Sequence, residues 1–190
     1  MEAHFTDARI LIAGLGLIGG SVAKALKYAG CRNIEGLDAD AEVLRAARSD
    51  GVTSGEFRAD GSRYDCVICS LPPRLVAPLY EQVSSSLRPG GVFTEMSGLK
   101  SAVVRDLTGV LAAGHELLCL HPMAGSEKSG YAHSDAALFR GAPLLLTPTA
   151  RTGDNALAFA EFLRKALGFG DMPSLPADEH DALIADLSHL

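Results

Sequence analysis

Two groups of residues in this sequence are of types and spacings that could do chemistry: a glycine-rich turn, and a histidine that opens a polar segment. The turn reads GLGLIG over residues 14–19 and has the spacing G-x-G-x-x-G. In such a turn Gly14 allows the tight bend, Gly16 lets the backbone approach a pyrophosphate, and Gly19 lets helix and strand pack closely. The pyrophosphate would lie at a helix N-terminus, where free N–H groups favour an anion. The turn therefore predicts a dinucleotide site.

An acidic residue at the expected distance indicates which dinucleotide would bind. Asp38 lies 19 residues after Gly19, where its carboxylate can accept hydrogen bonds from ribose hydroxyls and would repel a 2′-phosphate. NAD is therefore expected rather than NADP, although Arg45 or Arg48 could soften that preference. The residues predicted to bind the cofactor are Gly14, Leu15, Gly16, Leu17, Ile18, Gly19 and Asp38, with Ser70, Leu71 and Pro72 at the end of a later strand.

The histidine is His121, which follows the apolar run ELLCL and precedes PMAGSEKSG. It is expected at the carboxyl end of a strand, the edge where open α/β sheets bind ligands. A histidine near its ordinary pKa could take a hydroxyl proton while hydride leaves the same carbon. Spacing alone leaves open the alternative that His121 only caps a strand end. His4, His115 and His133 have no motif around them and are interpreted as surface residues.

The elements that must position these residues alternate along the chain, since short apolar runs are followed by stretches of helical spacing. The spacing predicts strands at residues 9–13, 33–37, 65–71, 91–96, 116–120 and 142–147, and helices at 18–28, 41–48, 75–87, 101–112 and 155–167. A long loop is expected between residues 125 and 141. The pattern predicts an α/β fold of the Rossmann type, with a doubly wound, mostly parallel sheet of six or seven strands.

Composition excludes several classes of function. The chain has 190 residues, 47% of them hydrophobic and 21% charged, with a formal net charge of -6. Lys and Arg are scattered, so no basic face for nucleic acid is expected. Apolar runs stay below the roughly 18 residues of a membrane span, and the N-terminus does not resemble a signal peptide, so a cytoplasmic protein is expected. Cys66 and Cys69 lie on one predicted strand and face opposite sides of it, so neither a disulfide nor a metal site is expected.

Longer motifs resemble one enzyme family. The run HPMAGSEKSG at residues 121–130, together with GLGLIGGS at 14–21 and SGLK at 97–100, resembles the prephenate and arogenate dehydrogenases of tyrosine biosynthesis. LFRGAP at 138–143, DEHD at 178–181 and SHL at 188–190 continue the resemblance over nearly the whole chain. The glycine turn is shared by many dehydrogenases, whereas the ten-residue run is far more specific.

The resemblance implies an oxidative decarboxylation that depends on NAD or NADP, from prephenate to 4-hydroxyphenylpyruvate or from arogenate to tyrosine. It makes His121 the base that removes the proton of the ring hydroxyl, with no metal needed. Ser126 and Glu127 match positions that line the substrate pocket, although Glu127 could also be a solvated loop carboxylate. His180 and His189 match positions near the substrate cleft. They lie nine residues apart, so on one helix they would face opposite sides.

One position departs from the family pattern. Many members carry Gly-Ser after the strand that ends here in Thr94-Glu95-Met96, with the serine helping to hold the histidine, whereas this chain reads Ser97-Gly98. Ser97 is predicted to be catalytic only if it reaches the same space by another backbone course. Lys100 is interpreted as a helix-start residue or loop anchor.

The predicted organisation is a dinucleotide-binding domain over residues 1–170 and the beginning of a helical domain over residues 171–190, apparently truncated. In the resembling family the second domain supplies a dimer interface and substrate-clamping residues, so a homodimer acting on a small molecule is expected of the intact protein, and weak or no activity of this fragment alone. Two other functions stay open, namely another Rossmann hydroxyacid dehydrogenase and a non-catalytic nucleotide-binding module.

Overall fold

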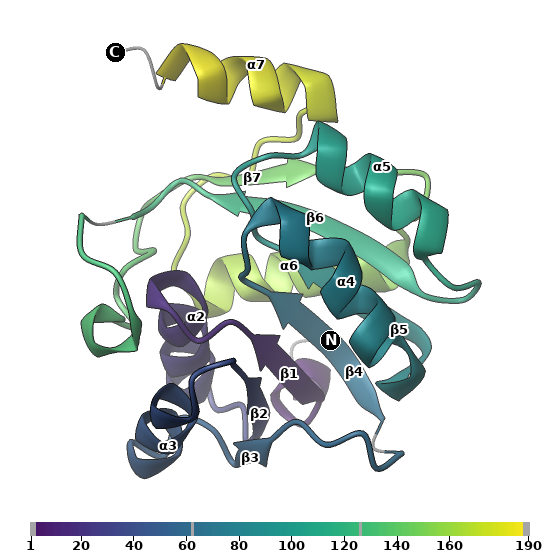
Figure 1. The fold of residues 1–190 in the computed structure, drawn as a ribbon. Coiled ribbons are helices and arrows are strands. Elements are labelled where there is room, and N and C mark those ends of the chain that lie inside the picture. Colours follow the sequence, from purple (N-terminus) through teal and green to yellow (C-terminus); the bar gives the residue numbers. More distant parts are fainter. Residues whose placement is uncertain (1–2, 62, 126, 188–190) are drawn as a thin grey trace.

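A seven-stranded sheet forms the centre of the computed structural model, which describes residues 3–61, 63–125 and 127–187 (Figure 1). The strand order is β3-β2-β1-β4-β5-β6-β7, and all neighbours are parallel except β6 and β7. The strands are β1 (Arg9–Ala13), β2 (Asn33–Leu37), β3 (Gly55–Glu56), β4 (Tyr64–Cys69), β5 (Leu87–Glu95), β6 (Glu116–Pro122) and β7 (Leu144–Thr147). The helices are α1 (Ala3–Thr6), α2 (Leu17–Tyr28), α3 (Ala41–Ser49), α4 (Pro73–Val83), α5 (Ser101–Val110), α6 (Asp154–Ala166) and α7 (Ala177–Leu187), with 3-10 turns at Ser84–Ser86 and Tyr131–His133.

The core lies on both faces of this sheet because successive strand residues point to opposite sides. Ile10 and Ile12 of β1 pack with α2, α3 and α6, whereas Leu11 and Ala13 pack with α4 and α5. All four side chains are fully buried, which explains why the strand is an unbroken apolar run. The doubly wound, mostly parallel fold expected from the sequence is confirmed.

Most predicted elements are present, with differences around residues 73–91 and one added strand. The helix expected at 75–87 begins at Pro73 and ends at Val83, and the strand expected at 91–96 begins at Leu87. The turn signal at residues 89–91 does not break this strand, because Gly90 takes a positive φ of 75° and the pairing with β4 shifts register there. The short β3 extends the sheet edge beyond β2.

Ligand chemistry in such a sheet belongs at the carboxyl ends of the strands, where the strand order reverses. The reversal lies between β1 and β4, so the glycine turn after β1 and the segment after β4 meet at one edge. Helix α7 lies against α5 at the end of the sheet, and its Leu183 and Leu187 are 38% and 47% exposed. In the described part of the chain, every helix is too short or too polar to cross a membrane.

Candidate active site

The glycine turn joins β1 to α2 with very little space on one side and open space on the other. Gly14 has a φ of 81°, and a Cβ on Gly19 would lie 1.8 Å from the Gly14 carbonyl oxygen. A Cβ on Gly16, in contrast, would meet nothing within 4 Å. Gly16 is also the N-cap of α2 and offers no side-chain acceptor to the first turn of the helix. The helix N-terminus is therefore open toward a ligand anion, as the motif predicts.

The other residues predicted to bind the cofactor surround this turn. The carboxylate of Asp38 accepts a hydrogen bond from the backbone N–H of Leu15 at 2.7 Å, which places it at the end of β2 beside the turn. Ser70, Leu71 and the exposed Pro72 follow β4, and Ser70 and Leu71 lie within contact distance of a Cβ placed on Gly14. The buried hydroxyl oxygen of Ser70 has no hydrogen-bond partner among the described residues. Two of the predicted residues have a packing role: the Leu15 side chain is fully buried in the core, and Gly19 leaves no room for a Cβ beside the Gly14 carbonyl.

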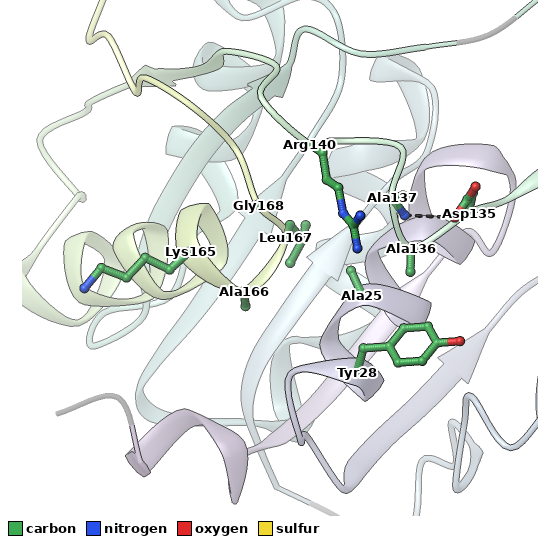
Figure 2. A pocket seen from close by; sticks show the side chains of 10 residues that line it. All are labelled: Ala25, Tyr28, Asp135, Ala136, Ala137, Arg140, Lys165, Ala166, Leu167 and Gly168. Carbon is green, nitrogen blue, oxygen red and sulfur yellow. Dashed lines mark hydrogen bonds between the residues drawn. The ribbon is translucent and has the colours of Figure 1, made fainter.

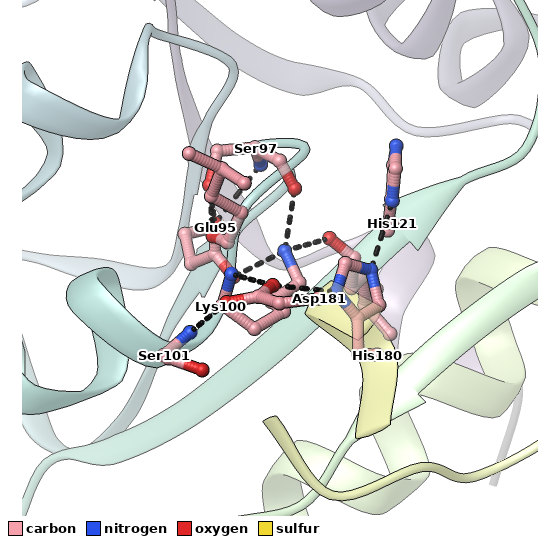
Figure 3. Close-up of polar contacts among 9 residues, drawn as sticks. Glu95, Ser97, Lys100, Ser101, His121, His180 and Asp181 are labelled. Carbon is pink, nitrogen blue, oxygen red and sulfur yellow. Dashed lines mark hydrogen bonds and ion pairs between the residues drawn. The ribbon is translucent and has the colours of Figure 1, made fainter. Parts of the chain in front are cut away.

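His121 is the next-to-last residue of β6, at the carboxyl end of that strand, and is partly buried. Its Nδ1 is 2.9 Å from Nε2 of His180, which belongs to α7 and is 0% exposed (Figure 3). A Cβ on Gly98 would lie 3.7 Å from Nε2 of His121, so that nitrogen faces the segment that follows β5. The structure thus brings together His121 and His180, two residues that are 59 positions apart in the sequence.

Asp181 holds the other side of His180. One carboxylate oxygen is 2.9 Å from Nδ1 of His180 and accepts the backbone N–H of Lys100 at 2.8 Å. The second oxygen accepts the backbone N–H of Ser101 at 2.9 Å, so the carboxylate caps the beginning of α5. Burial raises the pKa of Asp181, but the hydrogen bonds from His180 and the two backbone N–H groups outweigh it and lower the pKa to about 2. Asp181 is therefore ionised at neutral pH.

The electrostatic environment keeps the His121 ring neutral. Burial is the largest cause that lowers its pKa, and the neighbouring Lys100 and His180 lower it further. Asp181 opposes them, and the resulting pKa is about 4, compared with an ordinary value of 6.5. At neutral pH the ring is therefore unprotonated at one nitrogen, as a proton acceptor must be.

A buried ion pair lies near His121. The Lys100 ammonium is 2.6 Å from the Glu95 carboxylate and donates to the carbonyls of Ser97 and Leu120, and both charged side chains are 0% exposed. Ser97 donates from its backbone N–H and its hydroxyl to the other oxygen of Glu95, at 2.9 and 2.6 Å. The hydroxyl of Ser97 thus bonds inside this cluster, and the contacts described for it do not include His121. Its catalytic role stays a prediction.

The remaining predicted site residues are placed as follows. Glu127 is exposed in the segment after β6, whereas Ser126 and His189 lie outside the described residues. Lys100 is the N-cap of α5, as interpreted from the sequence. The interpretation of His115 as a surface residue is wrong, because the residue is only 9% exposed and its ring bonds at 2.8 Å to the hydroxyl of Tyr80.

Sequence reasoning missed three members of this site, namely Glu95, Asp181 and the buried charge of Lys100. The sequence does contain a signal for Glu95. A carboxylate inside an apolar strand needs a charged partner, and Lys100 follows it five residues later. No local signal indicates the Asp181 cap, since it joins α7 to α5 across 80 positions.

A separate cavity of about 370 Å³ lies between α2, α6 and the segment around residue 137 (Figure 2). Arg140 points toward Ala25 and Tyr28 there, whereas Lys165 points away from them. The described residues that line this cavity include none of the predicted site residues. The candidate active site is therefore the sheet edge with the glycine turn and His121.

Comparisons with known proteins show which family this chain resembles. The family "Prephenate dehydrogenase, nucleotide-binding domain" matches residues 22–168. Prephenate dehydrogenase of Bacillus subtilis is 33% identical over 95% of this chain and 50% of its own length, and cyclohexadienyl dehydrogenase of Zymomonas mobilis is 30% identical over 95% and 62%. Prephenate dehydrogenase of Aquifex aeolicus, solved with hydroxyphenyl propionate and NAD+, superposes with a TM-score of 0.82 at 27% identity over 96% of this chain and 70% of that one.

The match covers most of this chain, and the chain spans 50 to 62% of the length of these curated relatives. The matched residues begin within α2, end two residues after α6, and include His121, Glu95 and Lys100. The chain belongs to the prephenate dehydrogenase family, of which it carries the nucleotide-binding domain.

Proposed function

We propose that the intact protein is an NAD-dependent dehydrogenase that converts prephenate to 4-hydroxyphenylpyruvate, a step of tyrosine biosynthesis. The observation that carries the proposal is the position of His121. Its ring lies at the carboxyl end of β6, at the same sheet edge as the glycine turn, with Nδ1 held by His180 and Nε2 on the opposite side of the ring. A neutral, oriented imidazole at this edge is what a proton acceptor for a bound hydroxyl requires.

The residues around the glycine turn fit NAD. Gly16 leaves room for the dinucleotide to approach the backbone, and the uncapped N-terminus of α2 offers N–H groups to its pyrophosphate. The Asp38 carboxylate lies where ribose hydroxyls would donate to it. The unpartnered hydroxyl of Ser70 supplies a further polar group at the same turn. When bound, NAD would supply the hydride acceptor.

The chain's own contribution to the reaction is proton transfer. We assign Nε2 of His121 to accept the proton of the substrate ring hydroxyl while the C–H bond of that carbon breaks to give a ketone, its electron pair leaving as hydride for the acceptor that bound NAD would supply. The ring carboxylate then leaves as carbon dioxide, and the electrons of that C–C bond complete the aromatic ring and leave a phenolate oxygen. The imidazolium of His121 returns its proton to that oxygen, which gives the phenol. A low-dielectric setting for this transfer follows from the burial of the ring.

Parts of the proposal concern the protein beyond this chain. We infer that α7 begins a helical second domain, that this domain forms a homodimer and clamps the substrate carboxylates, and that the nucleotide-binding domain ends near residue 170. Ser126, Glu127 and His189 stay assigned to the substrate side. The cytoplasmic location also stays a prediction. The apolar side chains that α7 exposes support a further contact on this helix.

The test is His121→Asn in the intact enzyme. This change keeps a polar side chain but removes the base, so kcat should fall roughly 10²- to 10⁴-fold while NAD affinity stays nearly unchanged. The measurement is the rate of NADH formation with prephenate and, in a parallel arm, arogenate, with calorimetry for NAD. A variant that keeps its turnover number would eliminate His121 as the base.

Assays of the wild-type protein with prephenate and with arogenate distinguish the remaining candidate functions. Turnover of arogenate in place of prephenate would change the substrate assignment and leave the role of His121 intact. NAD binding without turnover of either substrate would instead favour another dehydrogenase or a non-catalytic nucleotide-binding module.

A further inference from the structure

Three side chains form a line of hydrogen bonds that ends at the proposed base. Asp181 lies 2.9 Å from Nδ1 of His180, and Nε2 of His180 lies 2.9 Å from Nδ1 of His121. Figure 3 shows the two imidazoles with these nitrogens pointing toward each other. Both nitrogens of His180 are therefore occupied, and its ring is 0% exposed. A buried ring in this position acts on its neighbours rather than on solvent.

The positions of the protons along this line follow from what each group can donate. An ionised carboxylate only accepts hydrogen bonds, so the Nδ1 of His180 that faces Asp181 must carry a proton. In a neutral imidazole the other nitrogen is then an acceptor, so Nε2 of His180 presents a lone pair to His121. The Nδ1 of His121 must donate to it. A neutral His121 with its proton on Nδ1 has its lone pair on Nε2, the nitrogen that faces Gly98.

We propose that His180, oriented by Asp181, is a positioning residue that fixes His121 in the Nδ1–H tautomer and so makes Nε2 the base. This inference rests on the proposed function and assigns to His180 a role in holding the base in place of a direct substrate contact. A histidine free to exchange tautomers would present an N–H to the substrate hydroxyl for part of the time, and in that form it cannot accept a proton.

The Asp181 carboxylate is anchored to the backbone, and this anchoring fixes the orientation of the His180 and His121 rings. Asp181 is tied to the backbone N–H groups of Lys100 and Ser101, so the carboxylate cannot rotate without uncapping α5. The charged groups around His121 are the Lys100 ammonium at the N-cap of α5, its partner Glu95 from β5, and Asp181 from α7. Lys100 lowers the pKa of the His121 ring, which supports the neutral His121 that the proposal requires.

A direct test reads the tautomers without any enzyme assay. Nitrogen-15 NMR of the imidazole rings in the NAD-bound protein near pH 7 should show the His121 proton on Nδ1 and a lone pair on Nε2. His180 should likewise carry its proton on Nδ1. A His121 ring protonated on Nε2, or a doubly protonated His180, would overturn the proposal.

A kinetic test uses two variants of the intact enzyme and a matched control. His180→Leu removes the acceptor for His121, so kcat should fall roughly 10- to 10³-fold while KM and NAD affinity change little. His180→Gln offers an amide oxygen to the same N–H and should recover part of that loss. His115→Leu removes a buried histidine of the same domain that bonds only to Tyr80 among described side chains, so it should lower stability but leave kcat unchanged.

The results distinguish this inference from the proposed function. If His121→Asn keeps its activity, the proposed base is wrong whatever the NMR spectra show. If His121→Asn is inactive but His180→Leu keeps a normal kcat, the base is right and the positioning role is wrong. If His180→Leu does not fold, the tautomer observed by NMR in the wild-type protein decides.

Discussion

Gly16 and Gly19, two of the three glycines of the turn at residues 14–19, should respond differently to the same substitution. Gly19→Ala places a Cβ 1.8 Å from the carbonyl oxygen of Gly14, whereas Gly16→Ala places one where nothing lies within 4 Å. Side-chain carbons essentially never come closer than 3.0 Å to such an atom. Helix α2 would therefore have to retreat from β1 by at least about 1.2 Å in a close-packed interior. Gly19 is thus expected to serve folding, and Gly16 to serve binding.

The magnitudes follow from this packing. Because the contacting atom is the backbone oxygen of Gly14 and cannot swing away, Gly19→Ala should lower the free energy of unfolding by about 3 kcal/mol or more, the upper end of overpacking costs. In a domain of ordinary stability this raises the unfolded fraction on the order of 100-fold. Gly16→Ala should change the free energy of unfolding by no more than about 0.5 kcal/mol. Its methyl group would nevertheless stand where the pyrophosphate approaches the backbone, so NAD affinity should fall by about tenfold or more.

Two measurements on this chain separate these effects. Urea unfolding followed by circular dichroism gives the stability of each variant, and calorimetry gives its affinity for NAD. A Gly19→Ala protein as stable as wild type would refute the packing argument. Wild-type NAD affinity in Gly16→Ala would refute the location of the dinucleotide.

Three further predictions concern charges. Asp38 would repel a 2′-phosphate, so calorimetry should show tighter binding of NAD than of NADP, and Asp38→Asn should narrow the difference; equal affinities in the wild type would contradict this. Lys100→Met leaves the Glu95 carboxylate buried without its partner and should lower the free energy of unfolding in urea by about 3–5 kcal/mol. The double variant that also carries Glu95→Gln should regain much of that stability. In the intact enzyme, kcat/KM should stay high down to near pH 4 instead of falling near 6.5, because the base is active above its lowered pKa; a fall centred at 6.5 would refute the burial argument.

Much of the fold could be predicted from the sequence because local patterns determine it. The run RILIA, the glycine turn and the apolar spacing of α2 define the first βα unit without reference to the rest of the chain. The turn signal before Val92 misled because a glycine can bend a strand without ending it. The two-residue β3 has too few residues to show any periodicity.

The candidate site could be predicted only in part, because its chemistry depends on contacts between distant segments. The motif around His121 predicts the base, but nothing near that motif in the sequence indicates that a histidine from α7 contacts its ring. The role of Ser97 also depends on the fold. The family resemblance implies a catalytic hydroxyl, and in the folded chain Glu95 accepts its hydrogen bond, so the catalytic role of Ser97 stays a prediction. Which acceptor a hydroxyl meets is decided by the course of the backbone.

The low pKa of His121 also bears on when the base becomes effective. A ring with a pKa near 4 is a weak proton acceptor in the free protein, and the positive charge of Lys100 contributes to that weakness. The proposed substrate carries two carboxylates, and an anion bound beside the ring would favour imidazolium and raise the pKa. The acid limb of kcat, which reports the substrate complex, should therefore lie at higher pH than the limb of kcat/KM, which reports the free enzyme. If the acid limbs of the two profiles coincide, the bound substrate does not raise the pKa of His121. The base would then act with the low pKa that it has in the free protein.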